Sequence, residues 1–138
     1  MSNLRAVRLD WLGQGMRFRA VGVEPATPAI EIDGDGTSGP SPMITLLMAA
    51  AACTGVDVVS ILQRMRVGLA QVTVDMEGER HEEQPRRYVR LHYRYRLSGQ
   101  DLDQTKAERA VALSLEKYCS VMASLAPDIQ VTHEVVLD

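Results

Sequence analysis

Residues 41–66 read SPMITLLMAAAACTGVDVVSILQRMR, and this stretch decides the fold. Ser41 is a suitable N-cap, and Pro42 suits the first helical position because its missing N–H costs nothing there and its φ is already helical. Over residues 43–59 apolar or small side chains point in every direction. No single face can be solvated, so the stretch predicts a long core helix that is covered on most sides.

The same helix must be distinguished from a membrane span. Polar side chains interrupt the run before it reaches the roughly 20 apolar residues that a bilayer requires, namely Thr45, Asp57, Ser60 and Gln63. We therefore expect no membrane association. The helix should end near Arg66, with Gly68 as its C-terminal stop.

The length and the net charge of the chain limit the number of domains and the kinds of partner to expect. A chain of 138 residues with 46% hydrophobic residues is long enough for one domain with its own core, so we expect a single domain over residues 1–138. The net charge of −3 gives no general attraction to nucleic acid. The first ten residues, MSNLRAVRLD, lack the basic and apolar segments of a secretory signal, which favours a cytoplasmic protein.

Two cysteines, Cys53 and Cys119, lie far apart in this sequence. In a reducing compartment such a pair is not expected to be a structural disulfide, which favours free, metal-binding or redox-active thiols. A zinc site needs about four ligands, usually in local pairs. The remaining candidate ligands are scattered along the chain at His81, His92 and His133, so we expect neither a metal site nor a cofactor.

Before the long helix, residues with β propensity predict a hairpin and a third strand. The predicted strands span residues 4–9, 16–23 and 29–32. Arg17 and Arg19 share one face of the second strand because side chains alternate along a strand. Residues 33–40, DGDGTSGP, predict a flexible loop that leads to the helix.

After the long helix, alternating residues predict strands over 71–77 and 88–97, joined by an exposed charged turn over 78–85. One face of the second strand is apolar, with Val89, Leu91, Tyr93, Tyr95 and Leu97. The other face carries Tyr88, Arg90, His92, Arg94 and Arg96. Arginines interleaved with tyrosine also occur on nucleic-acid surfaces. Because the neighbouring strand offers Asp75 and Glu77, we favour ion pairs across a solvated face instead.

Asp103 is a plausible N-cap for a second helix that runs through Lys117. Small and apolar residues at helical spacing predict its packed face, at Ala107, Ala110, Val111, Ser114 and Tyr118. A last strand is predicted over residues 129–137. Strands and helices are grouped in blocks, which indicates an α+β fold with mostly antiparallel sheet.

Both cysteine segments carry a family resemblance. The Ser-Pro helix start, the CTGVDVVSIL of residues 53–62 and the LEKYCSV of residues 115–121 resemble the OsmC/Ohr family of bacterial stress-induced peroxidases, in its general OsmC-like branch rather than the classical organic hydroperoxide resistance branch. The resemblance covers residues 39–137. It implies an intertwined homodimer with the long helices buried at its centre and two active sites at the subunit interface.

The resemblance also implies roles for single residues. Cys53 would be the peroxidatic thiol and Cys119 the resolving thiol, reduced afterwards by a dithiol such as a lipoyl group. The chemistry agrees, because a thiolate attacks one peroxide oxygen and the resulting sulfenic acid condenses with a second thiol. Cys53 lies about three turns into its helix, where the helix dipole no longer acts, so a cation is needed. Arg17 or Arg19 matches the family's arginine.

One family residue is missing from this chain. The family's glutamate, which holds that arginine, falls one or two residues after the helix-opening proline, where this chain has Met43 and Ile44. Asp57, Glu24 and Glu31 are possible substitutes. Asp57 lies four residues after Cys53 and so on the same helix face, but its charge would also oppose a thiolate.

Two functions follow as hypotheses. The retained cysteine pair favours a thiol-dependent peroxidase that reduces small or lipid-like organic hydroperoxides. The missing glutamate favours a non-catalytic OsmC-like binding protein that holds an apolar ligand at the dimer interface. A redox sensor is a weaker third hypothesis.

Overall fold

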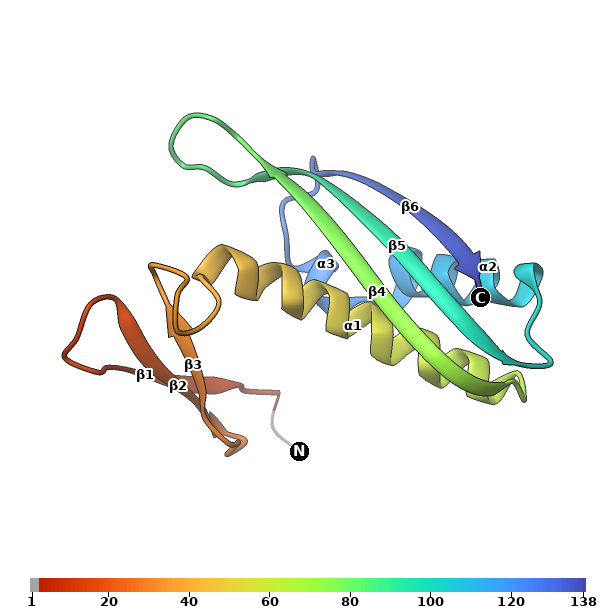
Figure 1. Cartoon of the computed structure of the whole chain (residues 1–138), viewed down its shortest axis with the longest axis horizontal. Helices are drawn as coiled ribbons and strands as arrows, with labels where there is room; N and C mark the ends of the chain where they lie inside the picture. The colour runs from red at the N-terminus through yellow and green to blue at the C-terminus, as the bar shows by residue number, and fades with distance from the viewer. Residues whose placement is uncertain (1–2) are drawn as a thin grey trace. The chain divides into compact units, whose positions relative to one another are not determined.

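The computed structural model of the chain describes residues 3–138 (Figure 1). These residues group into two compact units, the first ending at Leu46 and the second running from Leu47 to Asp138. The element order is β1 (Ala6–Trp11), β2 (Arg17–Glu24), β3 (Ile30–Asp33), α1 (Pro42–Arg64), β4 (Gly68–Arg80), β5 (Tyr88–Gln100), α2 (Gln104–Leu113), the π-helical turn η1 (Ser114–Tyr118), α3 (Ser120–Ala123) and β6 (Gln130–Leu137). This is the predicted order of strands and helices, with η1 and the one-turn helix α3 added.

The first unit contains the antiparallel sheet β1–β2–β3. The predicted hairpin and third strand are confirmed within a few residues. In the β2–β3 pair, Arg17 lies opposite Asp33 and Arg19 lies opposite Glu31. Both arginines project from the same face, as alternation requires.

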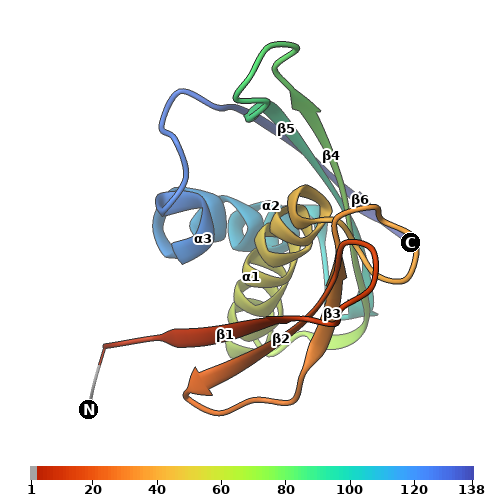
Figure 2. The ribbon, with the colours of Figure 1, turned by 90° about the vertical axis from the view of Figure 1, so that its left-hand side faces the viewer.

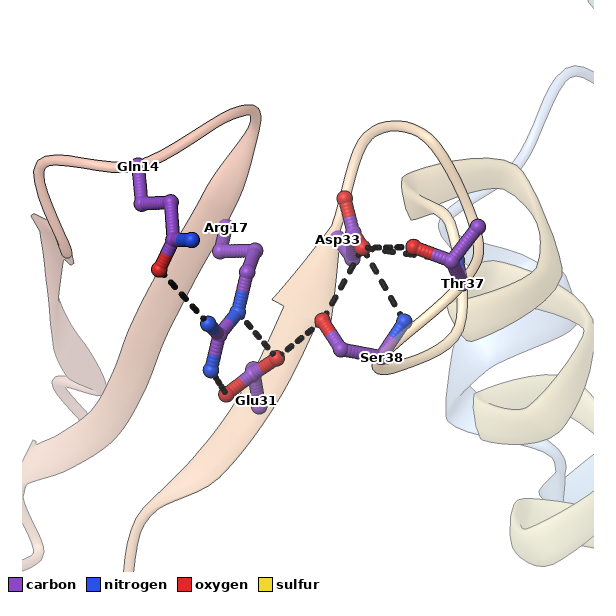
Figure 3. A network of polar contacts seen from close by, with 6 residues as sticks. All are labelled: Gln14, Arg17, Glu31, Asp33, Thr37 and Ser38. Carbon is purple, nitrogen blue, oxygen red and sulfur yellow. Dashed lines mark hydrogen bonds and ion pairs between the residues drawn. The ribbon is translucent and has the colours of Figure 1, made fainter.

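The loop after β3 is organised around a buried carboxylate, that of Asp33, which is only 1% exposed. The backbone N–H of Asp35 donates to it at 2.9 Å. The backbone N–H groups and the hydroxyls of Thr37 and Ser38 also donate to it, at 2.9–3.3 Å (Figure 3). Donation from the Ser38 and Asp35 backbone holds the pKa of Asp33 far below its usual range. The stretch predicted to be a flexible loop is therefore a hydrogen-bonded turn.

Helix α1 begins as predicted, because the Ser41 hydroxyl accepts a hydrogen bond from the Ile44 N–H at 3.3 Å. Its predicted end is wrong in detail. The helix stops at Arg64, and the residue in the left-handed conformation is Arg66, with φ 62°. Gly68 is the first residue of β4, so an arginine takes the position that glycine usually occupies.

The second unit packs its helices on one face of the sheet β4–β5–β6 (Figures 1 and 2). Strand β4 pairs antiparallel with β5, whereas β6 runs parallel to β5. The core is built from one stripe of α1 and the inward faces of β5 and α2, and its buried members are Val58, Leu62, Val67, Tyr93, Tyr95, Leu97, Ala107, Ala110 and Val111. The predicted α+β class is confirmed, with one parallel strand pair.

Only one stripe of α1 is buried, formed by residues four apart: Ala50, Thr54, Val58 and Leu62. A second stripe at the same spacing is exposed and apolar, with Met48 54% and Val56 69% exposed. A helix covered on most sides was expected. In a single copy of the chain, the covering elements reach one side of it.

The outer face of β5 carries the expected ion pairs. Arg96 pairs with Asp75 at 3.2 Å, as predicted. Arg90 and Arg94 pair with Glu79 and Glu134, and not with Glu77 as expected. These exposed pairs contribute little stability each.

Tyr88 was predicted to share this outer face, but it is buried, with 5% exposure. The strand register shifts between Glu79 and Arg80, so Arg80 lies opposite Tyr88. A one-residue shift reverses which face a side chain occupies. Tyr88 therefore turns toward the core.

The second helix is capped by Asp103, which accepts from the Lys106 N–H at 2.8 Å. It changes after Leu113 into the π-helical turn η1. The wider turn rotates later residues away from the predicted face, so Ser114 is buried while Tyr118 is 50% exposed. The prediction for Tyr118 is wrong for this reason.

Candidate active site

Both cysteines of the second unit are free thiols. Cys53 lies in the middle of α1, directly before the buried Thr54, and is half-buried. Thr54, the next residue in sequence, belongs to the buried stripe of the helix. The helix therefore holds Cys53 at the edge of the core.

Cys119 is placed by the π-helical turn η1. Its backbone N–H donates to the Ser114 carbonyl at 2.8 Å, which closes the turn. The chain then becomes extended at Cys119, with ψ 99°, before α3 begins. The side chain is 5% exposed and borders a cleft of about 260 Å³ between η1, α3 and the start of β6. A wide turn followed by a break thus directs the second cysteine into the core.

The two thiols lie near each other, close enough for Cys53 to act on the pKa of Cys119. Burial raises the pKa of Cys119 first of all, and the neighbouring Cys53 and Asp57 raise it further. Cys119 therefore keeps its proton at neutral pH and can donate it to the Cys53 sulfur. The fold brings together two cysteines that are distant in sequence.

A chain of polar side chains holds the elements around the thiols together. The Ser114 Oγ lies 2.8 Å from the Asp57 Oδ2 and 2.8 Å from the Thr54 Oγ1, and the Thr54 Oγ1 lies 2.8 Å from the Tyr95 hydroxyl. A carboxylate only accepts, so the single Ser114 proton goes to Asp57 and Thr54 donates to Ser114. Tyr95 then donates to Thr54, and each hydroxyl is satisfied. The chain connects β5, α1 and η1.

Tyr93 is the second tyrosine beside the thiols. Its ring stacks on that of Tyr95, with centroids 5.9 Å apart and planes inclined by 11°. Burial raises the pKa of Tyr93, and the charges of Cys119, Tyr95 and Cys53 act in the same direction. Among the residues that the structure describes, none forms a hydrogen bond with its hydroxyl.

The candidate arginines, Arg17 and Arg19, belong to the first unit. Figure 3 shows Arg17 with its partners. Arg17 forms a bidentate pair with Glu31, with Nε and Nη2 each 3.0 Å from a carboxylate oxygen. The Gln14 side chain also accepts from Arg17, and Ser38 donates to Glu31. Hydrogen bonding to Glu31 raises the pKa of Arg17 and, reciprocally, lowers that of Glu31. Both groups are therefore charged at neutral pH.

The three carboxylates considered as substitutes for the family's glutamate thus behave differently. Glu31 holds Arg17, Asp57 accepts from Ser114, and Glu24 is exposed at the end of β2. Arg19 is also exposed. Which arginine acts on Cys53 stays a prediction.

Several residues of the site were not predicted as functional. Ser114 and Tyr95 were assigned only to packed faces, and Thr54 only to a long apolar run. Their polar atoms were a signal, because a buried hydroxyl requires a partner. Within residues 3–138, no three His, Cys, Asp or Glu side chains gather where a metal ion could bind.

An apolar groove runs along the second unit between α1 and β4, with a volume of about 680 Å³. Its lining is mostly small and apolar, with Ala51, Ala52, Gly55, Val56, Val59, Ser60, Gln63, Val72 and Val74. Cys53 directly follows two of the lining residues. An apolar molecule or an apolar surface fits this groove chemically.

Known proteins are similar to this chain in sequence and in fold. A family model described as OsmC-like protein matches residues 34–134. Protein YhfA of Escherichia coli strain K12 is 39% identical over 127 residues, which cover 91% of this chain and 92% of YhfA.

Among solved structures, a hypothetical protein from Aquifex aeolicus VF5 has a TM-score of 0.83 at 28% identity, covering 99% of each chain. The organic hydroperoxide resistance protein OhrB of Bacillus subtilis shares the fold more distantly, with a TM-score of 0.59 at 14% identity over 98% of each chain. The family match and the identity with YhfA establish that this chain belongs to the OsmC-like protein family.

Proposed function

We propose that this protein is a thiol-dependent peroxidase that reduces small or lipid-like organic hydroperoxides. The observation that carries the proposal is the thiol pair, with Cys53 and Cys119 near each other although they come from different helical segments. Two adjacent free thiols are what a two-cysteine cycle requires. The distant fold relationship to an organic hydroperoxide resistance protein supports the same chemistry.

The two cysteines have different roles in the proposed catalytic cycle. The Cys53 thiolate attacks the terminal oxygen of the hydroperoxide, the O–O bond breaks, and the alkoxide leaves as an alcohol after taking up a proton. The Cys53 sulfenic acid then condenses with Cys119, releasing water and forming a disulfide. A dithiol of the lipoyl type returns both thiols and becomes a disulfide itself. Cys119 suits the resolving role because its raised pKa keeps it a thiol while Cys53 reacts.

Arg17 is the arginine that we assign to the peroxidatic site, in preference to Arg19. Its bidentate pair with Glu31 keeps the guanidinium in one orientation. Glu31 would thereby replace the family glutamate that is missing at Met43 and Ile44. An oriented cation stabilises a thiolate and the negative charge that develops on the peroxide.

The working form is proposed to be a homodimer of one domain per chain, residues 1–138. The exposed apolar stripe of α1, with Met48 and Val56, supports a second copy as its cover. Large exposed apolar patches on a soluble protein mark interaction surfaces. The central helix of a dimer would then be covered from both sides.

Helix α1 is long and apolar enough to cross a membrane by length and composition. In an OsmC-like protein it is the core helix, and neither a signal nor a span. A cytoplasmic location is part of the proposal, because a reducing compartment keeps both thiols available.

The groove between α1 and β4 favours a second candidate function. Its volume of about 680 Å³ lies within the range of small-molecule sites. A non-catalytic OsmC-like protein would hold an apolar ligand there, at the dimer interface. The two functions differ in whether the thiols react with peroxide.

One equivalent of cumene hydroperoxide should remove both free thiols from the reduced protein within seconds to minutes. Cys53→Ser should retain Cys119 unreacted, because the attacking thiolate is missing. Cys119→Ser should lose one thiol and accumulate a sulfenic acid that dimedone traps. Free thiols counted with a chromogenic disulfide report each result. Two persistent thiols, together with an apolar molecule released on denaturation, would contradict the peroxidase and favour the binding protein.

Glu31→Gln should slow thiol loss by about 3- to 10-fold, because a neutral amide orients Arg17 less firmly than a carboxylate and the exposed pair is partly screened. Glu24→Gln is the matched control, since Glu24 is an exposed carboxylate near the end of the preceding strand β2. Stopped-flow kinetics of Cys53 oxidation measure both. Equal rates for the two variants would remove the pair of Arg17 and Glu31 from the mechanism.

Val56→Asp should convert a dimer to a monomer, because it places a charge in the exposed apolar stripe. Val131→Asp, the same change at an exposed valine on β6 and not on α1, should remain a dimer. Light scattering coupled to size exclusion gives the mass of each. A monomeric wild-type protein at micromolar concentration would contradict the proposed assembly.

A further inference from the structure

The Tyr93 hydroxyl is a buried donor with no partner. Its side chain is 0% exposed, and among the side chains that the structure describes its oxygen is the buried one without a hydrogen bond. Leaving such a group unsatisfied is unfavourable. By contrast, Tyr95, two residues away and equally buried, is bonded to Thr54. The Tyr93 hydroxyl is therefore a buried donor that no described side chain uses.

The surroundings of Tyr93 point to the thiols. The bond between Tyr95 and Thr54 fixes β5 against α1 at the residue next to Cys53. Tyr93 lies on the same face of β5, with its ring stacked on Tyr95. The charges of both cysteines act on its hydroxyl. The phenol and the two thiols thus lie in the same part of the second unit, near enough for their charges to interact.

The protonation state of Cys53 explains why the Tyr93 hydroxyl is not hydrogen-bonded to it. A thiol sulfur is a weak acceptor, whereas a thiolate or a sulfur-bound oxygen is a strong one. Burial keeps the Tyr93 hydroxyl protonated, so it acts as a donor and not as a base. Its partner would form only when Cys53 becomes charged.

We propose that the Tyr93 hydroxyl donates a hydrogen bond to the negative charge that forms on the Cys53 sulfur, and so acts directly on the reactive thiolate. The inference rests on the proposed function, in which Cys53 is the attacking thiolate. Within the second unit, the other titratable groups here are Cys119, Asp57 and Tyr95. Cys119 can also donate to Cys53, while the charge of Asp57 opposes a thiolate.

The test measures the rate at which iodoacetamide alkylates Cys53 as a function of pH. The Cys119→Ser background is used so that Cys53 is the thiol that reacts. Adding Tyr93→Phe should lower the rate at pH 7 about tenfold and move the half-maximal pH up by about one unit, the size expected for a hydrogen bond to a charged group. Tyr88→Phe is the control, because Tyr88 is a buried tyrosine of the same strand whose pKa is set by burial and Arg80 and not by the cysteines. It should leave the profile unchanged.

If Tyr93 had only a structural role, its variants would show different melting temperatures and pH profiles from those expected here. Tyr93→Phe removes an unpaired hydroxyl, so its melting temperature should equal or exceed that of the parent. A 3-fluorotyrosine at position 93 is a stronger donor and should move the half-maximal pH downward, which loosened packing would not do. An unchanged profile in both variants, or shifts of the same sign, would overturn the assignment.

The alkylation test uses no hydroperoxide, so it separates the two proposals. Opposite shifts in the two Tyr93 variants combined with thiols that resist peroxide would keep Tyr93 as the donor and reject the peroxidase. Rapid peroxide reaction with an unchanged alkylation profile would keep the peroxidase and reject the role of Tyr93.

Discussion

The hydrogen-bonded chain from Tyr95 through Thr54 and Ser114 to Asp57 is the interaction on which the site depends. It crosses from β5 to α1 and on to η1, which are the elements that position the two thiols. Each buried bond contributes only about 1 kcal/mol net, but a donor left without its partner costs about 1–3 kcal/mol. These bonds therefore add little to the free energy of unfolding but select one packing arrangement. Any alternative packing would leave several hydroxyls unsatisfied.

This constraint accounts for the π-helical turn. A regular helix from Asp103 onward would carry its buried face as far as Tyr118. The wider turn instead leaves Ser114 buried beside Asp57 and brings Cys119 into the core at its end. Cys119 is thus held as a protonated neighbour of Cys53, and its raised pKa follows from burial there. In the first unit, Glu31 holds Arg17 in a bidentate ion pair.

The long-range patterns of the sequence were sufficient for the fold. The apolar run of α1 and the alternation along β5 predicted their elements, and the segments around Cys53 and Cys119 predicted the family. Features set by local geometry were not predicted: the left-handed Arg66, the inward turn of Tyr88 and the loop built on Asp33. Each depends on which hydrogen bonds close a turn or shift a register, and residue type alone does not determine that. Thr54 was missed for a related reason, because one hydroxyl in an apolar helix resembles a tolerated substitution until its partners are seen.

The central claim is that Cys53 and Cys119 of one chain lie close enough to form a disulfide. Peptide mapping under non-reducing conditions tests it most directly, on dilute protein oxidised with diamide, which needs no peroxidase activity. The account predicts one dominant linked peptide pair, with Cys53 joined to Cys119 within a single chain. Linkage between chains, or two thiols that stay free under diamide, would contradict it.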